Sequence, residues 1–461
     1  MLQFKNFSIS FGNTTILNCC NLTLKKGEVT VITGTSGCGK SSFIRCMNGI
    51  IPQMSEANIQ GTIIYQRGEE SIPFHTMDIT ERSQYVSTVF QNPKTQFYAT
   101  DTFDEMTFAL ENRCIPKEEI LQRIDEYTSL LQTKHLLNRD IFSLSGGQKQ
   151  MVAITSVAML EQDIYIFDEP SSSLDQESIV RLADSIKKLK EMGKIIVIAE
   201  HRLYYLSNIL DKLCVIEHGS LEEYTKEEIT DEWIQQKNLR TMREIKKEEL
   251  GEIQTIHLKD RQTQKDNAGL YFQDYIFSYG KLPILDCSFS FSKGINFIIG
   301  KNGVGKSTFF HCICGLNKKF KGKTYLDARQ IKKPYQHISL VMQDVNYQIF
   351  TESVDSELSL VTRDETIKEN ILREMGLFEK RTYHPQILSG GEKQRLLIGI
   401  ARASKKEIVL FDEPTSGLCK SNMMKMIHYI KQMEKEGKTI LIITHDYELI
   451  YHCKGNVYEF C

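Results

Sequence analysis

A repeated set of short motifs constrains this chain more than any other feature. A glycine-rich stretch that ends in lysine and serine occurs from Gly34 to Ser42 and again from Gly300 to Thr308. Three later motifs also recur, beginning at Leu144, Phe167 and His201 and again at Leu388, Phe411 and His445. The loop lysines lie 266 residues apart, whereas the later motifs lie 244 apart. The chain therefore consists of two similar halves, and the first has 22 additional residues between its glycine-rich stretch and its second motif.

Two halves predict two domains, since 461 residues are too many for one compact core. The segment 221–267 separates the halves and is rich in Lys, Glu and Gln, with Trp233, Ile234 and Leu239 as apolar anchors. We expect a first domain over residues 1–245, with a partly helical extension at its end. A linker over 246–268 and a second domain over 269–461 follow.

Short apolar runs precede each chemical motif and indicate the fold. They cover residues 29–32, 164–167 and 195–198 in the first half, and 295–299, 408–411 and 440–443 in the second. Such runs suit central strands that are buried on both faces of a parallel sheet. Between two of them, Ile179, Ala183, Ile186 and Leu189 keep a helical spacing that ends at Gly193. The predicted fold class is therefore α/β, present twice.

Both glycine-rich stretches fit the pattern G-x-x-x-x-G-K-[ST]. Glycines let backbone N–H groups turn inward around phosphates, and the next helix points its positive end at them. Lys40 and Lys306 are expected to reach the β- and γ-phosphates, and Ser41 and Ser307 to hold Mg²⁺. Two copies in matched surroundings exclude a chance glycine-rich turn. The predicted nucleotide-binding residues are Gly34, Thr35, Ser36, Gly37, Cys38, Gly39, Lys40, Ser41 and Ser42, and Gly300, Lys301, Asn302, Gly303, Val304, Gly305, Lys306, Ser307 and Thr308.

An acid pair ends an apolar run in each half. Asp168 and Asp412 come at the ends of expected strands, where a Mg²⁺-coordinating acid would lie. Glu169 and Glu413 follow directly and are placed to orient or deprotonate an attacking water. A single Asp-Glu pair would more often be a solvated loop, but its recurrence after two such runs favours catalysis.

Together, these motifs resemble the nucleotide-binding domains of ABC proteins over nearly the whole chain. The resemblance implies two tandem P-loop NTPase domains that bind and hydrolyse ATP with Mg²⁺. Each would have a RecA-like core, an antiparallel β subdomain and a helical signature subdomain. It also implies an adenine-stacking aromatic at Phe11 and Tyr279, a Mg²⁺-sensing glutamine at Gln91 and Gln343, and a switch histidine contacting the γ-phosphate at His201 and His445.

The motifs that begin at Leu144 and Leu388 both read Leu-Ser-Gly-Gly. In this family two domains face each other, and each ATP lies between the glycine-rich loop of one and the Ser-Gly-Gly motif of the other. The resemblance therefore implies that the two halves of one chain pair. Site one would combine Lys40 and Glu169 with Ser389, Gly390 and Gly391. Site two would combine Lys306 and Glu413 with Ser145, Gly146 and Gly147.

The loop after the acid pair, which the family calls the D-loop, differs between the halves. It ends in Asp175 in the first half and in Cys419 in the second. Because this loop crosses to the opposite site in the family, we hypothesise that site one is the weaker site. A tolerated loop substitution is the alternative.

The segments around the two glutamines indicate a partner. Residues 89–98 and 341–350 resemble the ATPases of energy-coupling factor transporters, which import vitamins and metal ions. In that family this segment receives a helix of a transmembrane coupling subunit. The resemblance implies a separate coupling subunit, a separate substrate-binding membrane subunit, and a peripheral position at the cytoplasmic face of the cell membrane.

Two other classes of tandem ABC ATPase stay open as alternatives: the sugar-importer type and the ribosome-acting type. The chain has 57 basic and 59 acidic residues, and its 221–267 segment is not basic, so we expect no nucleic-acid partner. No apolar stretch approaches the roughly 20 residues needed to span a bilayer. We therefore expect other chains to supply any membrane-spanning part.

Overall fold

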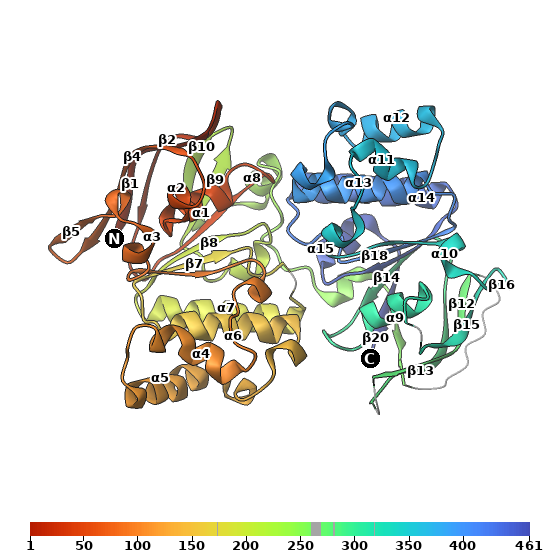
Figure 1. Cartoon of the computed structure of the whole chain (residues 1–461), viewed down its shortest axis with the longest axis horizontal. Helices are drawn as coiled ribbons and strands as arrows, with labels where there is room; N and C mark the ends of the chain where they lie inside the picture. Colours follow the sequence, from red (N-terminus) through yellow and green to blue (C-terminus); the bar gives the residue numbers. More distant parts are fainter. Residues whose placement is uncertain (173, 260–268, 280–281, 318) are drawn as a thin grey trace. The chain divides into compact units, whose positions relative to one another are not determined.

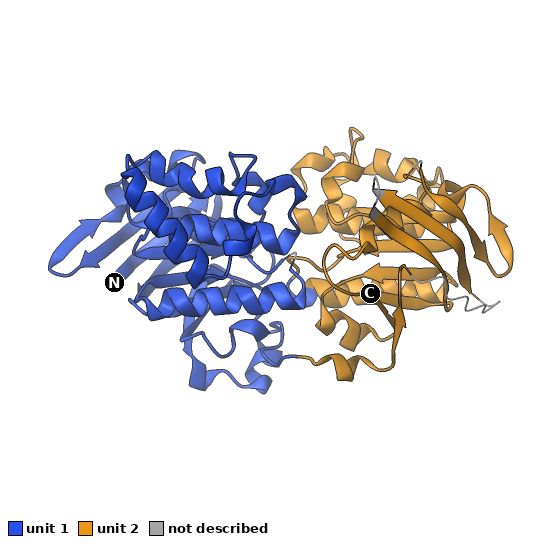
Figure 2. Cartoon of the chain, turned by 90° about the horizontal axis from the view of Figure 1, so that it is seen from below, with its two compact units in different colours: residues 1–244, 419–421 blue, residues 245–418, 422–461 orange. Residues whose placement is uncertain are grey.

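The computed structural model describes residues 1–172, 174–259, 269–279, 282–317 and 319–461, without the side chains of Tyr279 and Leu282. The chain divides into two compact units, shown in Figure 2: unit 1 has residues 1–244 and 419–421, and unit 2 has residues 245–418 and 422–461. Both units contain a six-stranded sheet, a four-stranded sheet and helices, which confirms the predicted α/β class (Figure 1).

The six-stranded sheet of unit 1 carries the motifs. Its strand order is β10-β9-β3-β8-β7-β6, and the strands are parallel except for β10 against β9. The strands are β3 (Val29–Gly34), β6 (Val86–Val89), β7 (Ile164–Asp168), β8 (Ile195–Ala199), β9 (Lys212–Glu217) and β10 (Ser220–Thr225). The antiparallel sheet has the order β2-β1-β4-β5, with β1 (Leu2–Phe11), β2 (Thr14–Leu24), β4 (Asn58–Arg67) and β5 (Glu70–Pro73).

Two cores cover the two faces of this sheet, because its central strands are apolar on both faces. In β7, Tyr165 and Phe167 pack into the core with the long helices, whereas Ile164 and Ile166 pack into the core with the antiparallel sheet. The helices of unit 1 are α1 (Lys40–Met47), α2 (Ile50–Gln53), α3 (Ile79–Arg82), α4 (Thr102–Glu111), α5 (Lys117–Leu130), α6 (Gly146–Ala158), α7 (Gln176–Glu191) and α8 (Asp231–Gln236).

The second half repeats this plan. Its six-stranded sheet is wholly parallel in the order β11-β20-β14-β19-β18-β17, with β11 (Ile253–Ile256), β14 (Ile295–Ile299), β17 (Ile338–Val341), β18 (Ile408–Asp412), β19 (Thr439–Ile443) and β20 (Asn456–Phe460). Its antiparallel sheet has the order β13-β12-β15-β16, with β12 (Leu270–Tyr279), β13 (Leu282–Phe291), β15 (Lys321–Leu326) and β16 (Arg329–Ile331). The helices are α9 (Lys306–Ile313), α10 (Pro334–His337), α11 (Val354–Ser359), α12 (Glu365–Glu374), α13 (Gly390–Ala403), α14 (Lys420–Lys435) and α15 (Tyr447–Cys453).

Part of the additional length of the first half lies in two helices of the helical subdomain. Helices α4 and α5 have 10 and 14 residues, whereas their counterparts α11 and α12 have 6 and 10. The antiparallel sheet takes another part, since β4 has 10 residues and β15 has 6. Both regions are peripheral to the parallel sheets, so the motif-bearing strands keep the same arrangement in both halves.

The segment between the halves has more regular structure than a linker. We predicted a linker over residues 246–268, but residues 253–256 form β11, which pairs in parallel with β20. Leu250 is buried in the core of unit 2. This strand was not predicted because the polar Gln254 and Thr255 between its two isoleucines interrupt the apolar pattern. Residues 260–268 lie outside the described residues.

Candidate active site

The predicted residues follow four neighbouring strands at one edge of each parallel sheet. In unit 1 the glycine-rich loop follows β3, His201 follows β8, Glu169 follows β7 and Gln91 follows β6. Because the carboxyl ends of parallel strands meet at the same edge, these side chains come together. In unit 2 the strands β14, β19, β18 and β17 carry the corresponding motifs in the same order.

Three glycines shape the first glycine-rich loop. Gly34, Gly37 and Gly39 have φ values of 147°, 82° and 109°, which residues with a Cβ atom rarely adopt. A Cβ at Gly34 would lie 2.4 Å from the carbonyl oxygen of Ile216, and one at Gly39 would lie 2.3 Å from Cγ2 of Ile16. At Gly37, no described atom lies within 4 Å of that position. The outer glycines thus permit close packing, and the middle one borders open space that suits phosphates.

The second loop has the same construction. Gly300, Gly303 and Gly305 have φ values of 138°, 81° and 118°. A Cβ at Gly300 would lie 2.5 Å from the carbonyl oxygen of Phe460, and one at Gly305 would lie 2.9 Å from a methyl group of Ile284. The space beside Gly303 is again open among the described atoms.

The two loop lysines are buried and turn back over their own loops. Lys40 Nζ lies 3.3 Å from the carbonyl oxygen of Thr35 and 3.0 Å from Nε2 of His201. Lys306 Nζ donates to the carbonyl oxygens of Gly300 and Lys301 at 2.6 and 2.9 Å. Both ammonium groups therefore contact carbonyl oxygens at the start of their own glycine-rich loops, which holds them beside the expected phosphate position.

The residues predicted for Mg²⁺ are adjacent in both halves. Ser41 Oγ donates to Asp168 at 3.3 Å, and the Ser307 side chain likewise hydrogen-bonds Asp412. Burial raises the pKa of both aspartates, against the effect of the serine hydroxyls. A hydroxyl and a carboxylate oxygen are ligands that Mg²⁺ accepts. The residues therefore fit the ion, which when bound would neutralise phosphate charge.

Glu169 is the centre of the site in the first half. Its Oε2 accepts from Gln91 Nε2 at 2.7 Å, and its Oε1 lies 3.7 Å from Nε2 of His201. Burial and then the charge of Glu200 raise the pKa of Glu169 to about 8. Burial and then the charge of Lys40 lower the pKa of His201 well below its usual value. The carboxylate form of a group with such a pKa is a stronger base than an ordinary glutamate, which suits it to accept a proton from water.

Glu413 occupies the same place in the second half. Its Oε2 accepts from the backbone N–H of His445 at 3.3 Å, and its Oε1 lies 3.6 Å from Nε2 of that histidine. His445 Nε2 also lies 3.0 Å from Oδ1 of Asn302, so the histidine contacts the glycine-rich loop as His201 does. Gln343 lies on the exposed loop after β17. Both Glu169 and Glu413 have positive φ, at 43° and 49°, a conformation that non-glycine residues adopt at a cost.

The Ser-Gly-Gly motifs begin a helix in each half. Ser145 caps α6 by accepting from the backbone N–H of Gln148, whose side-chain oxygen in turn accepts from the Ser145 backbone N–H. Ser389 and Glu392 repeat this capping box at α13. In each half the two glycines, Gly146 and Gly147 or Gly390 and Gly391, form the first turn of the helix.

The predicted aromatic residues stand at the ends of β1 and β12. Phe11 is half-buried and pairs with Thr14 in the turn of the β1–β2 hairpin. The same hairpin supplies Ile16, which lies against Gly39, so the structure places this turn beside the glycine-rich loop. The side chain of Tyr279 lies outside the described residues.

Two residues at the site were not predicted. Glu200 and Asp446 flank the histidines on opposite sides, one directly before His201 and the other directly after His445. Each accepts a hydrogen bond from the hydroxyl of the residue that follows the Asp-Glu-Pro motif, Ser171 or Thr415. The acidic residue therefore precedes the histidine in the first half and follows it in the second. Aligning the halves at their offset of 244 residues would have revealed this difference, since Glu200 aligns with Thr444 and Arg202 with Asp446.

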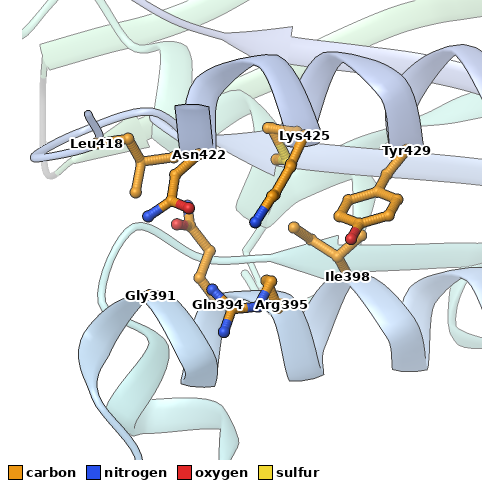
Figure 3. Close-up of a pocket in the computed structure, with 9 residues that line it drawn as sticks. Gly391, Gln394, Arg395, Ile398, Leu418, Asn422, Lys425 and Tyr429 are labelled. Atoms are coloured by element: carbon orange, nitrogen blue, oxygen red, sulfur yellow. The ribbon is translucent and has the colours of Figure 1, made fainter. Parts of the chain in front are cut away.

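A small pocket in unit 2 lies between α13 and α14 and is lined by Gly391 among others (Figure 3). Two polar side chains of its lining hydrogen-bond to the protein: Arg395 Nε donates to the carbonyl oxygen of Met375 at 2.9 Å and the Tyr429 hydroxyl to that of Glu374 at 3.2 Å. The pocket therefore reflects helix packing at the start of α13.

Comparisons with known proteins matched a family model, relatives and solved structures. The sequence model of the family described as ABC transporter matches residues 17–172 and 284–416. Two putative ABC transporter ATP-binding proteins of Treponema denticola are 37% and 36% identical to the chain, and each match covers 98% of the chain and 93% of the relative. The solved structure of the RNase-L Inhibitor has 22% identity and a TM-score of 0.63, with 97% of this chain and 86% of that chain covered. At that identity the likeness concerns the fold.

Proposed function

This chain belongs to the ABC transporter ATP-binding proteins and is an ATPase, and we propose that it powers an energy-coupling factor type importer of a vitamin or metal ion. In this proposal it lies at the cytoplasmic face of the cell membrane. A transmembrane coupling subunit and a substrate-binding membrane subunit are separate chains.

The proposed chemistry uses the groups at the sheet edge. Lys40 and Lys306 neutralise phosphate charge, and Glu169 and Glu413 orient and deprotonate the attacking water. His201 and His445 lie between the glycine-rich loop and the glutamate, so both sense the γ-phosphate. Because ATP and ADP bind the closed state with different affinities, hydrolysis drives a conformational change.

The observation that supports a membrane partner is the loop after Gln91. Glu105, in α4, accepts from the backbone N–H groups of Tyr98 and Ala99, both at 2.9 Å. With the backbone held by these two hydrogen bonds, Tyr98 is 80% exposed. Its ring stacks on the ring of Phe108, which is 40% exposed, and the two ring centroids lie 5.1 Å apart. Contiguous exposed aromatic rings of this kind mark interaction sites.

The second half builds the same loop. Glu357, in α11, accepts from the backbone N–H groups of Phe350 and Thr351 at 2.7 and 2.6 Å. Phe350 is 73% exposed, and Leu360, which corresponds to Phe108, is 60% exposed. Two apolar surfaces at matched positions suit a partner that contacts both halves through short apolar helices, as a coupling subunit would.

Among the helices that the structure describes, none is long and apolar enough to cross a bilayer. The proposal therefore requires a membrane-spanning partner, and isolation of that partner tests it. The full chain with an affinity tag would be purified from membranes of its native host in mild detergent, and the bound proteins identified by mass spectrometry. We expect a multi-spanning membrane protein in stoichiometric amount.

Matched variants decide whether the proposed surface holds that protein. Tyr98→Ser with Phe350→Ser should abolish its recovery and leave the ATPase activity of the isolated chain unchanged. Val180→Ser, at an exposed position on α7, should leave recovery intact. Recovery of ribosomes in place of a membrane protein, or full recovery of the membrane protein with the double variant, would contradict the proposal.

A further inference from the structure

The carboxyl group of Glu200 is buried, with 2% of the residue exposed, and accepts five hydrogen bonds. The Ser171 hydroxyl donates at 2.6 Å and its backbone N–H at 3.3 Å, and the Tyr205 hydroxyl donates at 3.0 Å. The backbone N–H groups of His201 and Arg202 donate at 2.7 and 3.1 Å. A carboxylate has only acceptor sites, and each of these five contacts uses it as an acceptor. Glu200 therefore joins the loop of His201 to the loop that follows Glu169.

The second half makes the same connection with a different residue. The Thr415 hydroxyl, which corresponds to Ser171, donates to Asp446 at 2.7 Å. Asp446 directly follows His445, and Thr444, at the position of Glu200, accepts from the Asp446 backbone N–H at 3.0 Å. The carboxyl group has thus moved from one side of the histidine to the other, while the hydroxyl that it holds has stayed in place.

A local consequence of this exchange is visible in the backbone. Asp446 also caps α15 by accepting from the Leu449 backbone N–H at 3.3 Å. The first half has Arg202 at the position of this cap, and the chain there forms a single 3₁₀ turn over Tyr204–Leu206. The two halves have therefore lost similarity in this helix and kept the carboxyl–hydroxyl contact, which indicates that the contact itself is needed.

We propose that Glu200 is the positioning residue that couples the switch histidine His201 to the loop after Glu169, a task that Asp446 performs in the second half. Movement of His201 on the γ-phosphate pulls the adjacent Glu200 and, through Ser171, the loop that begins two residues after Glu169. Arg202 Nη1 supports the same loop by donating to the Ser171 carbonyl oxygen at 3.3 Å. The proposal rests on ATP hydrolysis alone and is independent of the proposed transport partner.

The chain itself supplies the design of the test. In the full chain with Glu413→Gln, steady-state ATP hydrolysis reports on Glu169. Glu200→Thr removes the carboxyl group, and Glu200→Thr with Arg202→Asp rebuilds the Thr-His-Asp order of residues 444–446. Both variants also carry Tyr205→Phe, because the corresponding Leu449 has no hydroxyl group and the buried tyrosine would lose its acceptor.

We expect Glu200→Thr to lower kcat by at least about tenfold, as loss of a buried charged hydrogen-bond acceptor predicts. The KM for ATP should change by less than about twofold, since Glu200 acts after binding. Addition of Arg202→Asp should restore kcat to within about threefold of the parent, because the introduced carboxylate then accepts from Ser171 as Asp446 does from Thr415.

Melting temperatures separate this role from a purely structural one. A variant that folds and keeps its kcat, or that loses affinity for ATP at constant kcat, would overturn the proposal. So would a loss of kcat or of folding in Glu200→Thr that Arg202→Asp leaves unrepaired. A loss of kcat at an unchanged melting temperature that the second substitution repairs supports it, whereas a loss of folding that the second substitution repairs indicates a purely structural role and would overturn it.

Discussion

Replacement of Glu169 by glutamine should stabilise the first unit in a pH-dependent way. The pKa of Glu169 is about 8 in the folded chain against 4.5 for an ordinary glutamate, chiefly because the carboxyl group is buried. Between these two values the folded chain holds one proton more than the unfolded chain. Stability therefore decreases as pH rises through this window, and the cost is complete above about pH 8.

The size of the effect follows from the same values. One pKa unit corresponds to about 1.4 kcal/mol, so a shift from 4.5 to about 8 sets an upper limit of about 5 kcal/mol. The opposing charge of Lys40 is already contained in this net shift, and relaxation of the site around the charged carboxylate reduces the limit further. We expect glutamine to recover on the order of 2 kcal/mol at pH 8.5 and close to none at pH 5, where the carboxyl group keeps its proton.

Differential scanning calorimetry of the nucleotide-free full chain measures this prediction. For a unit of this size, about 2 kcal/mol raises the melting temperature by roughly 4–8 °C. The wild-type chain, Glu169→Gln and the exposed control Glu69→Gln would be compared at pH 5 and pH 8.5. An equal shift at both pH values, or a lower melting temperature of Glu169→Gln at pH 8.5, would refute the assignment of a destabilising buried charge.

Three further predictions concern stability, catalysis and Mg²⁺ binding. Gly39→Ala should lower the melting temperature more than Gly37→Ala, because only the former places a Cβ against an isoleucine methyl group; equal losses would contradict this. Glu413→Gln should reduce ATP turnover more than Glu169→Gln does if the cysteine that ends the second D-loop weakens site one, and equal reductions would exclude unequal sites. Ser41→Ala should raise the Mg²⁺ concentration needed for half-maximal turnover in the Glu413→Gln chain, and an unchanged requirement would exclude this hydroxyl as a ligand.

The sequence predicts those parts of the site that follow from backbone geometry. The glycines at 34, 37 and 39 are needed at positive φ, and the Asp-Glu pair must follow a strand to reach the common sheet edge. These requirements fix the residue types at fixed spacings, so the recurrence of the pattern in both halves identifies these site residues. The helical spacing before Gly193 is confirmed in the same way by α7.

The remaining features depend on tertiary contacts that no local pattern records. Glu169 has a positive φ, and its backbone N–H donates to the carbonyl oxygen of Ala199 on the neighbouring strand, 30 residues away in the chain. The strand β11 forms only because β20, at the opposite end of the second half, offers an edge for it to pair with. Short polar segments of this kind resemble linkers in composition.

The exchange between Glu200 and Asp446 limits what motif comparison can say about such a chain. Read position by position, Glu-His-Arg and Thr-His-Asp differ at both residues beside the histidine, and the first half lacks the aspartate of the second. In three dimensions, both present one carboxyl group to the hydroxyl that follows the Asp-Glu-Pro motif. The two halves therefore share the carboxyl–hydroxyl contact and differ in the residue that makes it. Either position beside the histidine can supply the carboxyl group, because both lie within reach of the same loop. Differences between tandem halves should accordingly be judged by the contacts that each residue makes before they are taken as evidence for unequal sites.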